Sequence, residues 1–228
     1  MEEKKLLFGT SGKDKATVKA FQDDFIDHGG DPKAVTQACS DMSPAFISGI
    51  EEYLPNAEIT FDKFHIVKII NDAVDMVRRA EVLENEVLKN TRYMWLKNES
   101  NLTEKQKCTI EDISHFNLKT SRAYQMRLNF QEFFTQPDRA SGEVYLKKWF
   151  YWATHSRLEP MIKAAYTIKA HWDGVLNWFD SHLTSGFIEG MNGLIQAAKN
   201  RARGYRSDKN FITMAYLLGG KFNFNLPT

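Results

Sequence analysis

Cysteine is scarce in this chain of 228 residues: Cys39 and Cys108 lie far apart in the sequence. Two isolated thiols exclude a disulfide scaffold, and no Cys-x-x-Cys pair is present to form one of the usual zinc sites. Hydrophobic runs are also short, and none approaches the roughly 18 residues that a membrane-spanning helix needs. The first residues, MEEKKLLFGT, lack the long apolar stretch of a signal peptide. We therefore expect a protein of the reducing cytoplasm without a membrane anchor.

The net charge of the chain is also close to zero. The chain has 30 lysines and arginines against 29 aspartates and glutamates, which gives a formal net charge of +1. No overall positive field therefore points to nucleic acid, and evidence for such a partner must come from a local cluster of cations. Apolar material is plentiful, with 43% hydrophobic residues, which indicates a folded globular protein. The length suits one domain, or one domain with an insertion.

Short apolar segments alternate with helical patterns in the first quarter of the chain. The segments with strand character are residues 4–9, 34–39 and 58–61. A helical pattern covers residues 14–28, and a second helix is predicted to begin with Ser43 as its N-cap and Pro44 in its first turn. Strands that are separated by helices favour parallel crossovers. The pattern therefore predicts an α/β sheet.

From Ile66 onward the pattern is helical. Apolar residues recur at helical spacing from Ile66 to Leu88, over about six turns. The charged residues that we expect on the outer side of this helix are Lys68, Asp75, Arg78, Glu81 and Glu84. Residues 103–134 and 143–180 also have helical patterns. The tryptophans of this block are expected in its core rather than as platforms for stacking bases; they are Trp95, Trp149, Trp152, Trp172 and Trp178.

Two aspartates follow predicted strands. Asp41 comes after the strand at 34–39, and Asp62 ends the strand at 58–61. The carboxyl ends of parallel strands share one edge of a sheet, where ligands bind. Carboxylates on one edge favour a cation between them, and Mg²⁺ takes such oxygen ligands. The residue types leave another reading open, in which Asp41 caps the next helix, Asp62 lies at the surface and His65 is structural.

A third carboxylate, Glu189, lies at the start of a predicted helix over about 186–200. Asn192, Gln196 and Lys199 follow it on the same polar stripe at helical spacing. The stretch that leads to a final predicted helix, 209–219, contains Arg201, Arg203, Tyr205, Arg206 and Lys209. Cations at this density beside a carboxylate suggest a metal site next to a polyanion. The alternative is a glutamate placed by the helix dipole and a merely solvated basic face.

Two long blocks, LPNAEITFDKFHIVK and IEGMNGLIQAAKNRARGY, are more specific in combination. With the sequence around them they resemble the catalytic domain of bacterial insertion-sequence transposases, the ISL-three group of the DDE superfamily, over nearly the whole chain. The resemblance implies a helix-rich α/β fold: an RNase H-like sheet that lacks its first strand or strands, with a large all-helical insertion. It divides the chain into a partial core (1–65), the insertion (66–180) and C-terminal helices that complete the core (181–228).

The resemblance also implies residue roles. Asp41 becomes the second catalytic aspartate and Glu189 the catalytic glutamate, and both become metal ligands. The stretch from Asp62 to His65 is similar to a Cys/Asp-x-x-His signature of related superfamilies, which implies an auxiliary pair that supports the site or contacts DNA. The assignment of Asp62 itself as the metal ligand stays open. Asn192, Lys199, Arg201, Arg203, Tyr205, Arg206 and Lys209 are implied to hold DNA.

The implied activity is DNA cleavage and strand transfer with Mg²⁺ or Mn²⁺ as cofactor. The implied partners are transposon ends and target DNA, in a homo-oligomer at the nucleoid of a bacterial cytoplasm. The family's first aspartate belongs on a strand upstream of residues 4–9, so we expect a C-terminal piece that is catalytically incomplete by itself. The alternatives are a non-catalytic DNA-binding or inhibitory remnant, an RNase H-like nuclease that cuts without joining, and a helical interaction domain whose carboxylates bind no metal.

Overall fold

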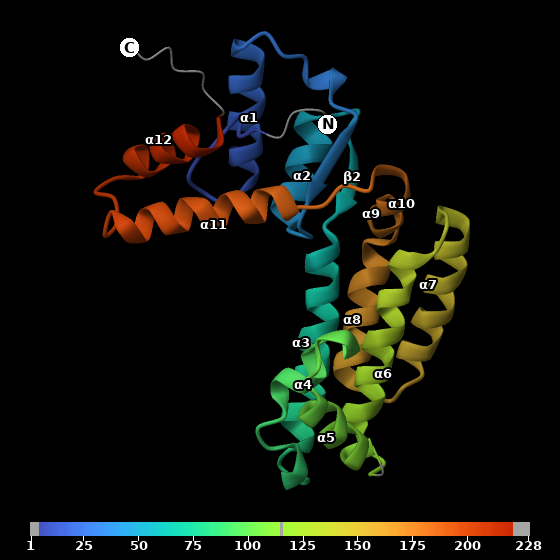
Figure 1. The fold of residues 1–228 in the computed structure, drawn as a ribbon. Coiled ribbons are helices and arrows are strands. Elements are labelled where there is room, and N and C mark those ends of the chain that lie inside the picture. The colour runs from blue at the N-terminus through green and yellow to red at the C-terminus, as the bar shows by residue number, and fades with distance from the viewer. Residues whose placement is uncertain (1–4, 115, 221–228) are drawn as a thin grey trace. The chain divides into compact units, whose positions relative to one another are not determined.

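The computed structural model describes residues 5–114 and 116–220 (Figure 1). The chain divides into two compact units. The first unit combines Met1–Thr60 with Leu183–Thr228, and the second unit is Phe61–His182. The predicted helix-rich α/β class is confirmed, and the residues that the structure describes form one small sheet among many helices. No helix within the described ranges is long and apolar enough to cross a membrane.

The sheet has two neighbouring parallel strands, β1 (Gln37–Ser40) and β2 (Glu58–Phe61). They are connected through α2 (Pro44–Tyr53), which begins at Pro44 after Ser43 as predicted. The strand expected at 58–61 is confirmed. The strand expected at 34–39 begins later, because Pro32–Ala34 forms a 3-10 turn.

The predicted strand at 4–9 is wrong for residues 5–9, which belong to no strand; residue 4 lies outside the described residues. The backbone N–H of Leu6 donates to the carbonyl oxygen of Gly219 at 2.8 Å. The N–H of Gly9 donates to the Tyr216 hydroxyl at 3.0 Å. These donors therefore bond to α12 (Asp208–Gly219) instead of a neighbouring strand.

Helix α1 (Lys15–Asp27) packs against α2. The carboxylate of Asp14 accepts a hydrogen bond from the N–H of Thr17, which caps the start of α1. Gly49 of α2 faces Val18 of α1, and a Cβ atom at Gly49 would lie 2.7 Å from a Val18 methyl carbon. Glycine at this position therefore allows the two helices to approach closely.

Helices α11 (Gly186–Arg201) and α12 pack on each other and agree closely with the predicted bounds. Met191 and Ile195 of α11 form a buried cluster with Ala215 of α12. Leu6 and Phe211 pack against this cluster from the outside. The N-terminal segment and the C-terminal helices thus share one small core within the first unit.

The second unit is helical beyond the end of β2. Its α-helices are α3 (Lys63–Glu81), α4 (Arg92–Leu96), α5 (Glu104–Ser114), α6 (Lys119–Gln131), α7 (Arg139–Thr154), α8 (Glu159–Ala170), α9 (Trp172–Leu176) and α10 (Trp178–Ser181). Its 3-10 segments are Glu86–Leu88, Glu99–Asn101 and Glu132–Thr135. Helix α3 packs along α6 and α8 (Figure 1). It is shorter than the predicted six turns and ends at Glu81.

The tryptophan prediction is correct in part. Trp95 and Trp149 are buried in the core of the second unit. Trp172 and Trp178 are half-buried, and Trp152 is 40% exposed. Residue type alone placed Trp152 in the core, but it lies on the outer side of α7, so this part of the prediction is wrong.

Three charged residues expected on the outer side of α3 are buried: Asp75, Arg78 and Glu81. Nη2 of Arg78 donates to the Asp75 carboxylate at 2.8 Å. The Glu81 carboxylate accepts the backbone N–H groups of Lys119 at 2.8 Å and Thr120 at 2.7 Å. Glu81 therefore caps the start of α6, where a helix has N–H groups without partners. The prediction was wrong for Glu81 because its bonding partners lie on another helix, and wrong for Asp75 and Arg78 because the two side chains pair with each other.

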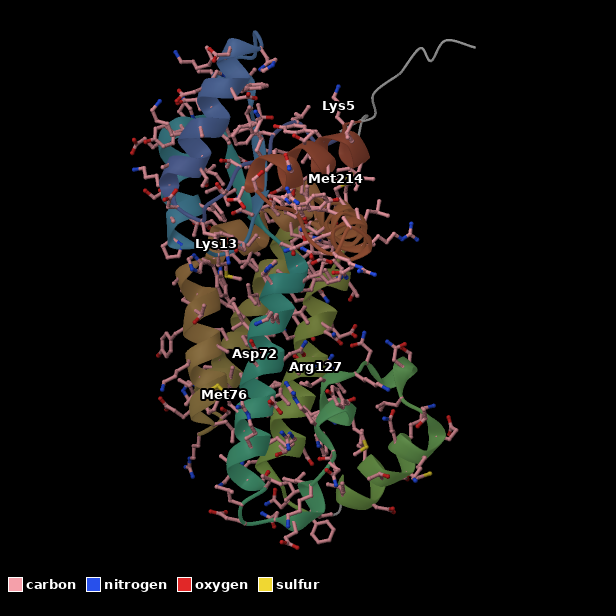
Figure 2. All side chains as sticks on the ribbon, turned by 90° about the vertical axis from the view of Figure 1, so that its left-hand side faces the viewer. Lys5, Lys13, Asp72, Met76, Arg127 and Met214 are labelled. Atoms are coloured by element: carbon pink, nitrogen blue, oxygen red, sulfur yellow. The ribbon has the colours of Figure 1, made fainter. Side chains whose placement is uncertain are left out.

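Arg127 of α6 is a buried cation, only 2% exposed, and it lies beside α3 in Figure 2. Its Nε donates to the Asn71 side-chain oxygen at 2.5 Å. Its Nη atoms donate to the carbonyl oxygens of Leu96 at 2.8 Å and Lys97 at 3.0 Å, and to the Asn98 side chain at 3.0 Å. These bonds join α6 to α3 and to the end of α4.

Candidate metal and nucleic-acid site

Asp41 follows β1 directly and is half-buried in the connection to α2. Its Oδ1 atom accepts a hydrogen bond from the N–H of Ser43 at 3.0 Å. Ser43 is the N-cap of α2 but makes no capping bond with its own side chain. The local role that the sequence left open for Asp41, in shaping the start of α2, is therefore present. The bond uses one carboxylate oxygen of the two.

Asp62 and His65 belong to the second unit, at the junction of β2 and α3. Oδ2 of Asp62 lies 2.9 Å from Nδ1 of His65. The Asp62 side chain is 1% exposed, whereas that of His65 is 46% exposed. The structure thus brings the two residues together as a buried carboxylate that orients a partly exposed imidazole. Lys63, next in the chain, places its Nζ 4.7 Å from the centre of the Phe134 ring.

Glu189 lies exposed in the first turn of α11. Its Oε1 atom is 3.3 Å from the hydroxyl of Ser185, the N-cap residue. Glu189 and Asp41 belong to the first unit, and Asp62 belongs to the second. Among residues 5–114 and 116–220, no three His, Cys, Asp or Glu side chains form a cluster that could hold a metal ion. The carboxylates are suitable ligands in kind, but they do not form a complete site here.

The cations predicted to hold DNA form what we call the basic segment: Lys199, Arg201, Arg203, Arg206 and Lys209. The segment spans the last turn of α11, the connection to α12 and the first turn of α12, and all five side chains are exposed. Within the described part of the chain none of them forms an ion pair. Such free cations are available to phosphate groups. Asn192, also predicted to contact DNA, is exposed earlier on α11, and Tyr205 is half-buried.

Helix α11 ends in the paired hydrogen bonds of a Schellman motif. The N–H of Gly204 donates to the carbonyl oxygen of Lys199 at 2.9 Å, and the N–H of Arg203 donates to that of Asn200 at 3.1 Å. The residue after the C-cap is left-handed in this motif and is usually glycine. Arg203 occupies that place with φ of 56°. A residue with a Cβ atom pays about 1–2 kcal/mol for this conformation.

Comparison with known proteins decides the family. The sequence model of a transposase family, the ISL-three type of the DDE group, matches residues 1–215. The chain belongs to this transposase family. No solved structure matches it, so an RNase H-like arrangement of its core remains a prediction.

The transposase chain has curated relatives of greater length. The transposase for insertion sequence element IS1001 of Bordetella parapertussis is 24% identical over 217 residues, which cover 92% of this chain and 53% of the relative. The transposase for IS1557 of Mycobacterium tuberculosis is 26% identical over 242 residues, which cover 93% of this chain and 54% of the relative. The chain thus spans about half the length of these relatives.

The site predictions omitted two polar residues of the first unit, Gln196 and Asp208. Both line a pocket that Asn192 also lines. The spacing of Asn192 and Gln196, four residues apart on one helix, was the only sequence signal for their proximity. Asp208 comes from the next helix, so its position depended on how α11 and α12 pack.

Proposed function

We propose that this chain is the C-terminal catalytic region of a DDE-type transposase, which acts on transposon ends and target DNA as a homo-oligomer in the bacterial cytoplasm. The observation that carries the proposal is the layout of α11. Glu189 lies in its first turn and the basic segment begins at Lys199, ten residues and therefore about 15 Å further along the axis. A DNA strand held by the basic segment can reach the Glu189 carboxylate along the same helix.

Asp41 and Glu189 are the metal ligands that we propose. Carboxylate oxygens are the donors that Mg²⁺ and Mn²⁺ prefer, and Mg²⁺ commonly takes one or two carboxylates together with substrate phosphates. A bound metal would stabilise charge on the phosphoryl oxygens and activate the attacking hydroxyl or water. Asp41 and Glu189 are two of the three carboxylates that the DDE pattern requires, in this proposal. We therefore assign its residues to ligand and DNA positions and not to a complete reaction.

Asp62 and His65 are positioning residues in this proposal. The buried Asp62 carboxylate fixes the orientation of the His65 imidazole, because one ring nitrogen is bound to it at 2.9 Å. The other side of the ring is free to face solvent or DNA, since the side chain is 46% exposed. The alternative role of Asp62 as a metal ligand is less favoured by its 1% exposure.

The purified 228-residue chain is expected to bind DNA without cleaving it or joining DNA ends, because we assign only two of the three DDE carboxylates, Asp41 and Glu189, within it. The measurement uses a labelled oligonucleotide with a free 3′-hydroxyl, a supercoiled target and Mg²⁺ or Mn²⁺. Strong metal-dependent cleavage that Glu189→Gln abolishes would refute this expectation. Cleavage without joining would favour the RNase H-like nuclease. A second measurement titrates Mn²⁺ into the double variant Asp41→Asn, Glu189→Gln, which should bind the ion more weakly than the wild type. Unchanged Mn²⁺ affinity would favour a helical interaction domain.

Replacement of Arg203 by glycine is expected to separate DNA binding from stability. Arg203→Gly removes the strain of a left-handed residue that has a Cβ atom. Thermal unfolding, monitored by circular dichroism, should therefore show equal stability or a gain of up to about 1 kcal/mol. The lost cation should reduce the salt slope of DNA binding by about 0.9. Arg203→Gln is the matched control, because it removes the charge and keeps the strain. Wild-type DNA binding by Arg203→Gly would mean that Arg203 contacts no phosphate.

A further inference from the structure

A pocket of about 420 Å³ lies in the first unit, lined by the N-terminal segment, α11 and α12. Phe8 and Phe211 contribute aromatic rings to its lining. Asn192, Gln196 and Asp208 contribute polar groups. Pockets of about 300–1,000 Å³ with mostly apolar walls and a few polar groups are typical of sites for small organic groups.

The lining indicates the chemistry of the occupant. Asparagine and glutamine amides both donate and accept hydrogen bonds, and the Asp208 carboxylate accepts them. Aromatic rings offer faces on which a flat group can stack. A flat heterocycle with donors and acceptors along its edge uses all of these groups, and nucleobases have this form.

Phe211, which lines the pocket, also lies next to the basic segment. Nζ of Lys199 lies 5.4 Å from the centre of the Phe211 ring. The ring of Tyr205 lies 5.7 Å from the same ring, at an interplanar angle of 45°. Gln196 precedes Lys199 by three residues and therefore lies on the same side of α11. A phosphate held by Lys199 places the base of its nucleotide within reach of the pocket.

We propose that this pocket holds one unpaired nucleobase of a DNA strand whose phosphates lie on the basic segment. The inference rests on the proposed DNA binding and adds a site for a base to it. A base inside a duplex must leave its stack and its partner to enter, so an already unpaired base binds at the least cost. Stacking and edge hydrogen bonds in the pocket then add affinity that phosphate contacts alone do not give.

The test compares two duplexes with the full 228-residue chain. One duplex carries a single bulged 2-aminopurine, and the other carries the same base fully paired. Fluorescence anisotropy measures binding of each duplex, and 2-aminopurine emission reports whether the base changes its surroundings. We expect the bulged duplex to bind about tenfold more tightly than the paired duplex. We also expect a clear change in 2-aminopurine emission on binding of the bulged duplex only.

Gln196→Trp is the decisive variant, because it fills the pocket from an exposed position and keeps every cation. It should bind the paired duplex as the wild type does and lose both the preference for the bulge and the change in emission. Asn210→Trp is the matched control, since Asn210 is an exposed amide of α12 outside the pocket lining. This control should behave as the wild type.

The outcomes separate the two proposals. Equal affinity for the two duplexes, with unchanged emission, would overturn the base pocket and leave DNA binding by the basic segment intact. An equal loss of affinity for both duplexes in Gln196→Trp would also overturn the base pocket, because Gln196 would then contact the DNA backbone. Absence of binding to either duplex would overturn the DNA-binding proposal and the pocket together.

Discussion

Neutralising four cations of the basic segment is expected to remove most of the salt dependence of DNA binding. The substitutions are Arg201→Gln, Arg203→Gln, Arg206→Gln and Lys209→Gln. Each cation that neutralises a phosphate contributes about 0.9 to the slope of log K against log salt, so the five cations of the segment give a slope of about −4.5, of which the four substitutions remove about −3.6. The wild type should then lose about 500-fold in affinity between about 50 and 200 mM salt. The variant should bind weakly at all these concentrations, as measured by anisotropy with a duplex of arbitrary sequence.

A matched control must change the net charge equally at another place. Four exposed lysines of the second unit serve this purpose: Lys68, Lys89, Lys107 and Lys163. Each pairs with a carboxylate of its own helix or turn, so none is free for phosphate. Replacing them by glutamine should leave the salt slope nearly unchanged. If both quadruple variants lose affinity equally, the affinity depends on the net charge of the protein and not on the position of the cations. The basic segment would then not be a specific contact surface.

The basic segment could be found in the sequence because its signal is local. Its residues are close together in the sequence, so the end of the helix and the cations that follow it can be recognised from one short stretch. The helix starts were local as well: Ser43 and Pro44 begin α2, and Asp14 caps α1. The Asp62–His65 contact has the same origin, because residues three apart meet at the start of a helix.

The features that the sequence did not indicate depend on partners far away in the chain. The segment around Leu6 has the composition of a strand, but its N–H bonds to Gly219, more than two hundred residues later. Glu81 has the spacing of an exposed residue, but Lys119 and Thr120 supply its hydrogen bonds. The pocket needs Phe8 beside two C-terminal helices. Periodicity describes one element at a time, so it cannot show which elements meet.

Arg127 gives the second large effect, this time on stability. Its hydrogen bonds within the described part of the chain go to carbonyl and amide oxygens and not to a carboxylate. Burial lowers the pKa of its guanidinium because the charged form loses water. Arg127→Met keeps apolar volume but leaves the carbonyl oxygens of Leu96 and Lys97 without these donors. Buried groups without partners cost about 1–3 kcal/mol each, so we expect a loss of about 3 kcal/mol in unfolding free energy.

Tryptophan fluorescence during urea unfolding measures this loss in the correct part of the molecule, because all five tryptophans lie in the second unit. Arg127→Lys keeps a charge but has one donor group where the guanidinium has a planar fork, so it should also destabilise the unit. Arg122→Met is the matched control: Arg122 is an exposed arginine of the same helix, and among the described residues its guanidinium donates only to the carbonyl oxygen of Ser156. Its loss should therefore cost about 1 kcal/mol or less. Equal stability of Arg127→Met and Arg122→Met would show that the oxygens around Arg127 find water or other donors. The end of α4 would then be held to α6 by apolar packing and not by this cation.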